Sequence, residues 1–264
     1  MCGIAGYSLS SQSSIDRTLA AQALLAAIAE RGADAVGYAF RGPAESRATV
    51  AKQRTGASEI LDRISVPAEA TQVLLHVRDY TKGHPSIPAN NHPVRHEAVV
   101  GVHNGIIIND DELLAGHTCA RAEDGMTVDS EAIFALVAHA MDVKALEELK
   151  GSMATAWLDE RVPDALFVAR GVGRPLWIGC GRREVFFAST RLALEIVERY
   201  AGIKLRKREV GEGSVLVLEN GRVDRHHRFT PDIGFQEANP LPAVRAPHEG
   251  AFCLQRLAAL AALA

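Results

Sequence analysis

Residues 1–7 read MCGIAGY, which places a cysteine directly behind the initiator methionine and a glycine directly behind the cysteine. The stretch is apolar and small, which is typical of a buried strand, and cysteine is itself often buried. A second interpretation is that Met1 is removed, so that a thiol and a free α-amine lie together on Cys2. An α-amine has a pKa of roughly 7.7–8.0, close to what a general base needs near neutral pH. Such a cysteine can be activated without a separate histidine.

Outward from this stretch, apolar runs of strand type recur in groups, and segments with helical periodicity lie between the groups. The runs are 2–9, 36–40, 48–53, 71–78, 98–104, 153–159, 165–171, 175–181, 184–190 and 213–223. The predicted helices are 16–31, 129–141, 143–150 and 191–200, and ENGR at 219–222 predicts a hairpin turn. This grouping differs from strict strand–helix alternation. It predicts an α+β fold with two mainly antiparallel sheets packed face to face and helices on the outer faces.

Composition excludes several classes of protein. Hydrophobic residues make up 47% and charged residues 23% of the 264 residues, and the formal net charge is −3, so no polyanion partner such as nucleic acid is indicated. No apolar run is long enough to cross a membrane, and the first residues lack the features of a secretory signal. We therefore expect a cytoplasmic protein. The four scattered cysteines and ten histidines show no metal-ligand spacing, and no phosphate-binding glycine loop is found, so we expect no metal and no cofactor.

The composition and periodicity of the sequence change after residue 229. The following segment holds four of the eleven prolines and little periodicity, whereas residues 251–264 are helix-prone. We expect residues 1–229 to form one domain. Residues 230–264 are expected to be a Pro-rich strap and a terminal helix that dock on that domain or on a partner.

Five segments, in order, resemble the class II glutamine amidotransferases, which are N-terminal-nucleophile hydrolases that release ammonia from glutamine. The similarity is to the glutaminase domain of the glucosamine-6-phosphate synthase type, with its RGxDSxG, HTRWATHG, NAHP, HNGxIxN and TDTEVI patterns. MCGIAGY (1–7) is similar to the start of that domain. The other four segments are similar to the patterns in the same order: ERGADAVGYAF (30–40) to the first, HVRDYTKG with NNHPV (76–83, 90–94) to the next two, HNGIIIND (103–110) to the fourth and TVDSEAI (127–133) to the last. The resemblance implies a four-layer αββα sandwich.

The resemblance also implies a role for each matched residue. Cys2 is the expected nucleophile, and Asn104 with the backbone N–H of Gly105 is the expected oxyanion hole, usually the largest catalytic contribution in acyl transfer. Arg78 is expected to hold the α-carboxylate of glutamine bidentately and Asp129 its α-ammonium. Three further residues are expected near the glutamine pocket or the cysteine: Thr81, His92 and Arg31. His76 and His103 are expected to be structural and to face each other across a sheet.

The sequence departs from the family pattern in the segment 76–83, where Asp79 replaces an aromatic residue and Lys82 replaces a histidine. Only about 35 residues follow the matched region, too few for a further domain of typical size. We therefore expect a glutaminase that acts through a Cys2 thioester and supplies ammonia to a synthase on another chain. Two alternatives are an N-terminal-nucleophile amidohydrolase that cleaves another γ-glutamyl amide by itself, and a non-catalytic glutamine-binding subunit.

Overall fold

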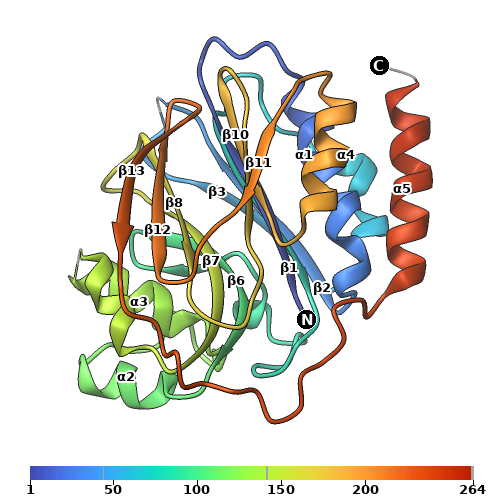
Figure 1. The fold of residues 1–264 in the computed structure, drawn as a ribbon. Coiled ribbons are helices and arrows are strands. Elements are labelled where there is room, and N and C mark those ends of the chain that lie inside the picture. Colours follow the sequence, from blue (N-terminus) through green and yellow to red (C-terminus); the bar gives the residue numbers. More distant parts are fainter. Residues whose placement is uncertain (44, 141, 263–264) are drawn as a thin grey trace.

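The computed structural model describes residues 1–43, 45–140 and 142–262. It contains two antiparallel sheets packed face to face, with helices on both outer faces (Figure 1). The expected α+β sandwich of αββα type is thereby confirmed.

The first sheet has seven strands and contains the N-terminus. Its spatial order is β11 (Arg206–Glu209), β9 (Trp177–Cys180), β10 (Glu184–Ala188), β1 (Gly3–Leu9), β4 (Gln72–Arg78), β2 (Ala35–Arg41) and β3 (Thr49–Gln53). Strand β1 is central and pairs with β4 from Gly3↔Val77 to Ser8↔Gln72. The start of the chain is therefore held inside the sheet, level with the end of β4.

The second sheet has six strands and carries the expected oxyanion segment. Its order is β13 (Arg222–Arg228), β12 (Ser214–Glu219), β8 (Ala165–Arg170), β7 (Gly151–Asp159), β6 (Val99–Ile107) and β5 (Val94–His96). Strands β12 and β13 are joined by two residues with positive φ, Asn220 and Gly221, as a tight hairpin requires. The hairpin predicted at 219–222 is confirmed.

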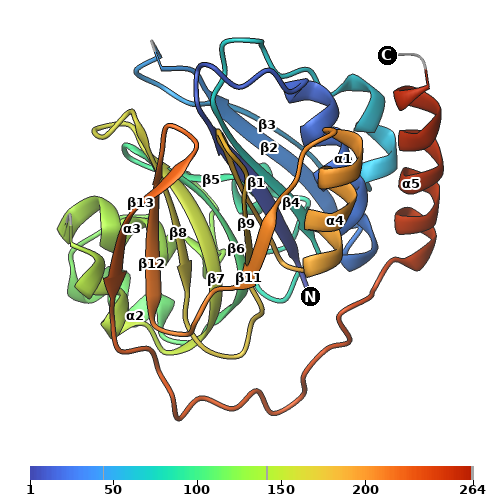
Figure 2. The same ribbon diagram turned by 45° about the horizontal axis from the view of Figure 1, so that its top comes forward.

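The helices form separate outer layers, which Figure 2 displays most clearly. Helices α1 (Arg17–Ile28) and α4 (Arg191–Tyr200) cover the seven-stranded sheet, and α5 (Pro247–Ala261) packs outside α1. Helix α3 (Glu131–Ala140) covers the six-stranded sheet with α2 (Asp110–Gly116) beside it. Every residue from Ala20 to Ile28 of α1 is buried, because the sheet covers one side of the helix and α5 the other.

The innermost core lies between the two sheets and consists of the inward-facing residues of their strands. Apolar side chains alternate along each strand with period two, so each sheet offers one apolar face to the other. Members of this core include Ile4, Leu74, Val100, Val102, Ala154, Ala156, Leu158, Leu166, Val168, Ile178, Phe187 and Leu216. Two further cores lie between each sheet and its helices. This packing fixes the distance between the sheets, and with it the geometry of groups that meet between them.

Several local predictions need correction. Residues 143–150 form the 3₁₀ helix η5 (Val143–Glu148), and the helix expected over 129–141 begins at Glu131, while Met141 lies outside the described residues. The helix-prone segment 251–264 begins earlier, at Pro247, and residues 263–264 lie outside the described part of the chain. Short elements escaped prediction because three to seven residues carry little periodicity. Among these are α2, β5 and the 3₁₀ turns η2 (Ala57–Glu59), η3 (Leu61–Arg63) and η4 (Pro88–Asn90), whereas η1 (Ala29–Arg31) is the last turn of the helix predicted over 16–31.

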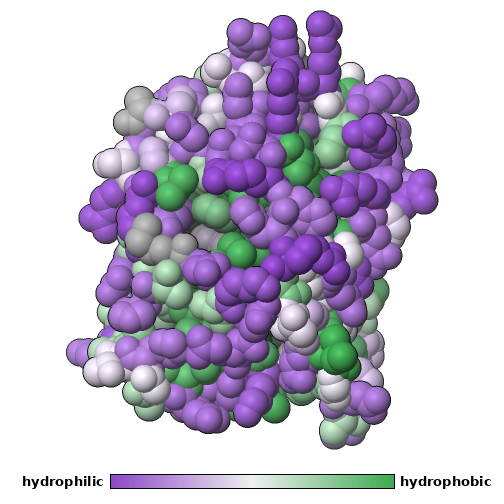
Figure 3. Space-filling view, turned by 60° about the vertical axis from the view of Figure 1, so that its left-hand side comes forward, coloured by the Kyte–Doolittle hydropathy of each residue, from purple (hydrophilic) through white to green (hydrophobic). Residues whose placement is uncertain are grey.

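The surface beside β13 is mostly hydrophilic, with hydrophobic residues scattered over it (Figure 3). The exposed side chains of β13 are mainly charged or histidine, which blunts an open sheet edge against pairing with another chain. Within the described ranges, no helix is long and apolar enough to span a membrane.

Candidate active site

Cys2 lies at one end of the sandwich, immediately before β1. Because Gly3 pairs with Val77, Cys2 is level with Arg78, the last residue of β4. The carbonyl oxygen of Cys2 accepts a hydrogen bond of 2.9 Å from Nε of Arg31, and its Sγ donates to the carbonyl oxygen of Asp79 at 3.5 Å. The expected nucleophile thus has two arginines beside it.

The thiol of Cys2 is a poor nucleophile as the structure holds it. Burial raises its pKa, and the hydrogen bond to Asp79 and the charge of Arg78 offset only part of that rise. A protonated thiol needs a base before it can attack a carbonyl. The nearest amine is the α-ammonium of Met1, which pairs with the carboxylate of Asp79.

Asn104 and Gly105 reach the same region from the other sheet. Nε2 of His76 in β4 lies 3.1 Å from the carbonyl oxygen of His103 in β6, which ties the two sheets together one residue before Asn104. His76 and His103 therefore belong to different sheets, and the expectation that they face each other across one sheet was wrong. Burial lowers the pKa of both imidazoles to about 3, so both are neutral and structural.

The side chain of Asn104 is fully buried, yet neither its Nδ2 nor its Oδ1 has a partner among the described residues. Buried amides are almost always hydrogen-bonded in folded proteins, so an open one indicates a place for a ligand or a water molecule. The next residue, Gly105, has φ of +155°, and a Cβ there would lie 2.0 Å from the carbonyl oxygen of Ser152. Only glycine fits this position.

Asp129 lies in the turn before α3, and its Oδ2 accepts a 2.7 Å hydrogen bond from the backbone N–H of Ile107. This bond connects the start of α3 to the end of β6. Burial raises the pKa of Asp129 to about 6, although the hydrogen bond from Ile107 opposes the rise. The carboxylate is therefore ionised at neutral pH and is available to a cation.

Arg78 is held rigidly. Its Nη1 donates to Oδ1 of Asn91 at 2.6 Å, and its Nη2 donates to the carbonyl oxygens of Lys82 and Gly83. Burial lowers the pKa of Arg78, while the nearby groups of Cys2 and Asp129 act in the opposite direction. The cation therefore lies within electrostatic reach of Cys2 and Asp129.

Two supports of Arg78 escaped the sequence analysis. Asn91 holds the guanidinium, and Nζ of Lys52 in β3 donates to the carbonyl oxygen of Asn91 at 3.0 Å. Asn91 belongs to the quoted segment NNHPV, which was a signal, whereas nothing in the sequence near Lys52 indicates this contact. A Cβ on Gly32 would lie 2.4 Å from the backbone of Arg78, so the segment after η1 also packs directly against this arginine.

The remaining predicted residues differ in placement. The ring of His92 is buried and stacks on that of His76 with centroids 4.1 Å apart, and neither of its nitrogens has a partner among the described residues. Burial holds the pKa of His92 well below its usual value, so the ring is neutral. Arg31 is buried beside Cys2 with its Nη2 unpartnered in the described structure. Thr81 is exposed on the loop after β4 and is not part of this buried cluster.

Ion pairs connect the loop after Arg78 to helix α2. Nζ of Lys82 lies 2.7 Å from the carboxylate of Asp110 and 2.9 Å from that of Asp111, at the start of α2. Arg121 also pairs with both aspartates. Lys82, one of the two departures from the family pattern, thus connects the loop to α2.

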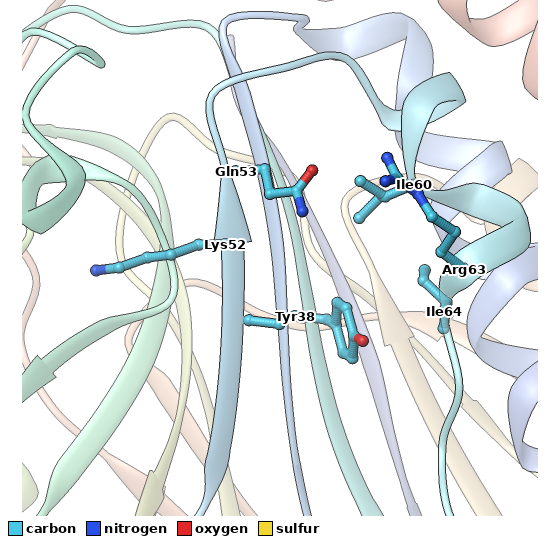
Figure 4. A pocket seen from close by; sticks show the side chains of 7 residues that line it. Tyr38, Lys52, Gln53, Ile60, Arg63 and Ile64 are labelled. Atoms are coloured by element: carbon cyan, nitrogen blue, oxygen red, sulfur yellow. The ribbon is translucent and has the colours of Figure 1, made fainter.

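A cavity lies away from Cys2 and the residues around it. It measures about 120 Å³ and is lined by Tyr38, Gln53, Ile60, Arg63 and Ile64 on the outer face of β2 and β3 (Figure 4). The side chain of Lys52 extends to the opposite side of β3, toward Asn91 (Figure 4). None of the predicted site residues, all within the described part of the chain, lines this cavity. No cluster of His, Cys, Asp or Glu in the described residues has the grouping of a metal site.

Comparison with known proteins gives consistent matches. Residues 81–195 match the family described as the glutamine amidotransferase domain. The isomerizing glutamine–fructose-6-phosphate aminotransferase of Escherichia coli is 34% identical over 217 residues, which cover 75% of this chain and 33% of that protein. The enzyme of the same name from Idiomarina loihiensis is 34% identical over 221 residues, covering 79% and 33%. The chain thus spans about a third of the length of these curated relatives.

Solved structures with the same fold are similar at low sequence identity. The glutamine phosphoribosylpyrophosphate amidotransferase of B. subtilis, with ADP and GMP, matches with a TM-score of 0.65 and 19% identity, over 86% of this chain and 49% of that one. The allosteric regulatory enzyme of purine biosynthesis gives 0.67 and 20%, over the same shares. A glutamine aminotransferase class-II domain protein from Silicibacter pomeroyi gives 0.53 and 14%, over 87% of this chain and all of that one.

Proposed function

The chain carries a class II glutamine amidotransferase domain, and we propose that it hydrolyses the side-chain amide of L-glutamine to glutamate and ammonia through a thioester on Cys2. The observation that carries this proposal is the open, fully buried amide of Asn104 on the same inter-sheet edge as Cys2 and Arg78. An amide without a partner in the folded protein is available to a developing oxyanion.

The proposed reaction begins once Met1 has been removed and the α-amine of Cys2 is free. This amine accepts the thiol proton, and the sulfur attacks the amide carbon of glutamine, so that a C–S bond forms and the carbonyl oxygen becomes an oxyanion. Nδ2 of Asn104 and the backbone N–H of Gly105 stabilise that oxyanion. The amine then gives its proton to the departing nitrogen, which leaves as ammonia. Water next attacks the thioester and releases glutamate with the thiol restored.

Glutamine is held by charges at its other end. The guanidinium of Arg78 is planar and preorganised by Asn91, and of its five N–H groups three donate to Asn91, Lys82 and Gly83 in the described structure, which leaves two for the α-carboxylate. The ionised carboxylate of Asp129 accepts hydrogen bonds from the α-ammonium. His92 forms a wall of the pocket through its stack on His76, and Arg31 holds the backbone of Cys2, whereas the role of Thr81, on the exposed loop after Arg78, rests on the resemblance alone.

We further propose that the ammonia is used by a synthase on another chain. Among the described residues, seven large hydrophobic side chains are exposed, and four of them are neighbours in the chain of residues that contact the site or its supports: Tyr80, Ile108, Ile233 and Val244. Tyr80 follows Asp79, and Ile108 follows Ile107, whose N–H binds Asp129. Ile233 follows Asp232, which binds the backbone of Gly151. Exposed apolar residues around a site are typical of a docking surface for a partner.

The test combines intact mass with glutaminase activity on one sample of the full chain. We expect Met1 to be absent and glutamate to be released, and Cys2→Ala to lower the rate by at least about 10⁴-fold because it removes the nucleophile. Cys180→Ala is the matched control, since Cys180 is also half-buried on a strand of the same sheet and has no role in the mechanism.

A sample that lacks Met1, binds glutamine and forms no glutamate contradicts the hydrolytic proposal and favours a glutamine-binding subunit. Turnover that a co-purified synthase does not stimulate, with another γ-glutamyl amide as the better substrate, favours an amidohydrolase that acts by itself.

A further inference from the structure

The segment between β13 and α5 passes along the edge of the sandwich on which the N-terminus lies (Figures 1 and 2). Residues 230–246, which we name the strap, contain no regular secondary structure; beyond the hydrogen bond from the backbone of Thr230 to Glu147 at its start, the strap is tied to the body at three places. Oδ2 of Asp232 accepts from the backbone of Gly151 at 3.2 Å, and Oε2 of Glu237 lies 2.6 Å from Nη2 of Arg174. The backbone N–H groups of Arg245 and Ala246 both donate to the carbonyl oxygen of Glu30.

Two of these attachments adjoin the candidate site. Gly151 pairs with Ile107, the residue that binds Asp129. Glu30 precedes Arg31, which binds the carbonyl oxygen of Cys2. The strap therefore follows the border of the active site and contacts the neighbours of its main groups.

The third attachment includes an ion pair with the glutamine loop, residues 79–83. Nε of Arg245 lies 3.2 Å from Oδ2 and 3.3 Å from Oδ1 of Asp79. The side chain of Asp79 is only 12% exposed, and its backbone oxygen accepts from Sγ of Cys2. Asp79 is also the position at which this sequence departs from an aromatic residue in the family pattern.

The other cation on Asp79 is the α-ammonium of Met1. If Met1 is removed, as the proposed function requires, this ammonium is lost and the new amine, on Cys2, serves as the base, so Arg245 is the side-chain cation that stays paired with Asp79. We propose that Arg245 is a positioning residue: by pairing with Asp79 it fastens the glutamine loop to the strap and so keeps Arg78 and Cys2 in the arrangement that binds glutamine. This inference rests on the proposed function.

The expected effect follows from the exposure of the pair. Arg245 is 42% exposed, so the ion pair is partly screened by solvent and is weak by itself. Its loss is expected to raise the KM for glutamine about fivefold, the change that corresponds to about 1 kcal/mol. The value of kcat should change less than twofold, since Arg245 touches none of the reacting atoms.

The experiment compares Arg245→Ala with two other variants of the full chain. Arg245→Lys keeps the charge and is expected to restore most of the affinity. Arg256→Ala is the matched control, because Arg256 pairs with Asp62 at a similar exposure, 44%, and ties α5 to the body away from the glutamine loop. Asp79→Asn is expected to raise the KM as Arg245→Ala does, and the double variant is expected to add nothing further.

A second readout is independent of turnover. The rate at which iodoacetamide alkylates Cys2, followed by peptide mass spectrometry, should rise severalfold in Arg245→Ala and stay unchanged in Arg256→Ala. If Arg245→Ala and Arg256→Ala alter the melting temperature alike and neither alters the KM or the alkylation rate, the strap only anchors α5 and the inference is wrong. A protein without glutaminase activity whose alkylation rate still depends on Arg245 contradicts the proposed function but keeps the positioning role.

Discussion

Arg41 and Asn104 are both fully buried between the two sheets, near opposite ends of the sandwich, but their polar atoms are treated differently. Nε of Arg41 donates to Oε1 of Gln72 at 2.8 Å, Nη1 donates to the carbonyl oxygen of Asp159, and Nη2 donates to that of Ala165. All three nitrogens are thus satisfied. The amide of Asn104 has no partner in the described structure.

For these two residues, the difference is the one expected between a polar group that stabilises the fold and one that binds a substrate. A buried polar group that stabilises the fold must replace the hydrogen bonds it loses from water, as Arg41 does across both sheets. A group meant for a substrate must keep its hydrogen-bonding capacity free, which costs stability in the unliganded protein. Within the described chain, unpartnered buried nitrogens also occur on Arg31 beside Cys2, on His92, and on His76, which we regard as structural, so an open polar atom indicates a substrate site only where other site residues meet it.

The largest expected effect is on stability, at Arg41, whose nitrogens all have hydrogen-bond partners. We expect Arg41→Ala to lower the free energy of unfolding by about 3–5 kcal/mol, because it leaves buried carbonyl oxygens and Gln72 without a donor. Urea denaturation measures the change, and kcat per folded molecule should be unaltered. A variant as stable as the parent would show that water replaces the guanidinium, and Arg41 would then not be a polar group that stabilises the fold.

The next effect is on catalysis, at Asn104, whose amide has no partner in the described structure. Asn104→Ala should lower kcat by about 10²–10³-fold, the usual result of removing one oxyanion donor. The free energy of unfolding should change by less than about 1 kcal/mol, since no hydrogen bond inside the described protein is lost. Both values can be measured on one preparation. A large loss of stability with little loss of kcat would make Asn104 a structural residue like Arg41.

The smallest effect is a pH dependence that sharpens the role of Asp129. Its pKa is raised to about 6, so the carboxylate is ionised above that pH and becomes neutral below it. The Kd for glutamine should therefore rise by about tenfold for each pH unit below 6. Calorimetry on the Cys2→Ala variant measures binding without turnover. Asp129→Asn should bind weakly and without this pH dependence, and a flat profile in the parent site would exclude Asp129 from ammonium binding.

The sequence predicted the elements of this fold where their periodicity was long enough. Helix α4 (Arg191–Tyr200) has the predicted bounds, and β1 and β4 lie within one residue of the predicted runs, because each has a continuous apolar pattern. The prediction over 143–150 was wrong in type, since Val143–Glu148 form a 3₁₀ helix and Leu149 is already extended. The candidate residues came from short motifs, and their roles remain proposals for the experiments above.

Other parts of the site could not be predicted from the sequence. Lys52 supports Asn91, and Arg245 pairs with Asp79 across 166 positions of sequence. Neither contact leaves a local pattern, because a lysine in a strand or an arginine in a Pro-rich segment looks like any exposed charge. The pairing depends on where two separately packed segments end in space.

By itself, the sequence determined the types of the long elements, the antiparallel sandwich and the residues that resemble an amidotransferase site, because periodicity and motifs are properties of neighbouring positions. The tertiary structure decided which groups meet. It brought Asn104 from one sheet to the edge that holds Cys2 and Arg78 in the other, left that amide open, and drew the strap to Asp79. These outcomes follow from the packing of side chains between the sheets, which sets distances between residues far apart in the chain.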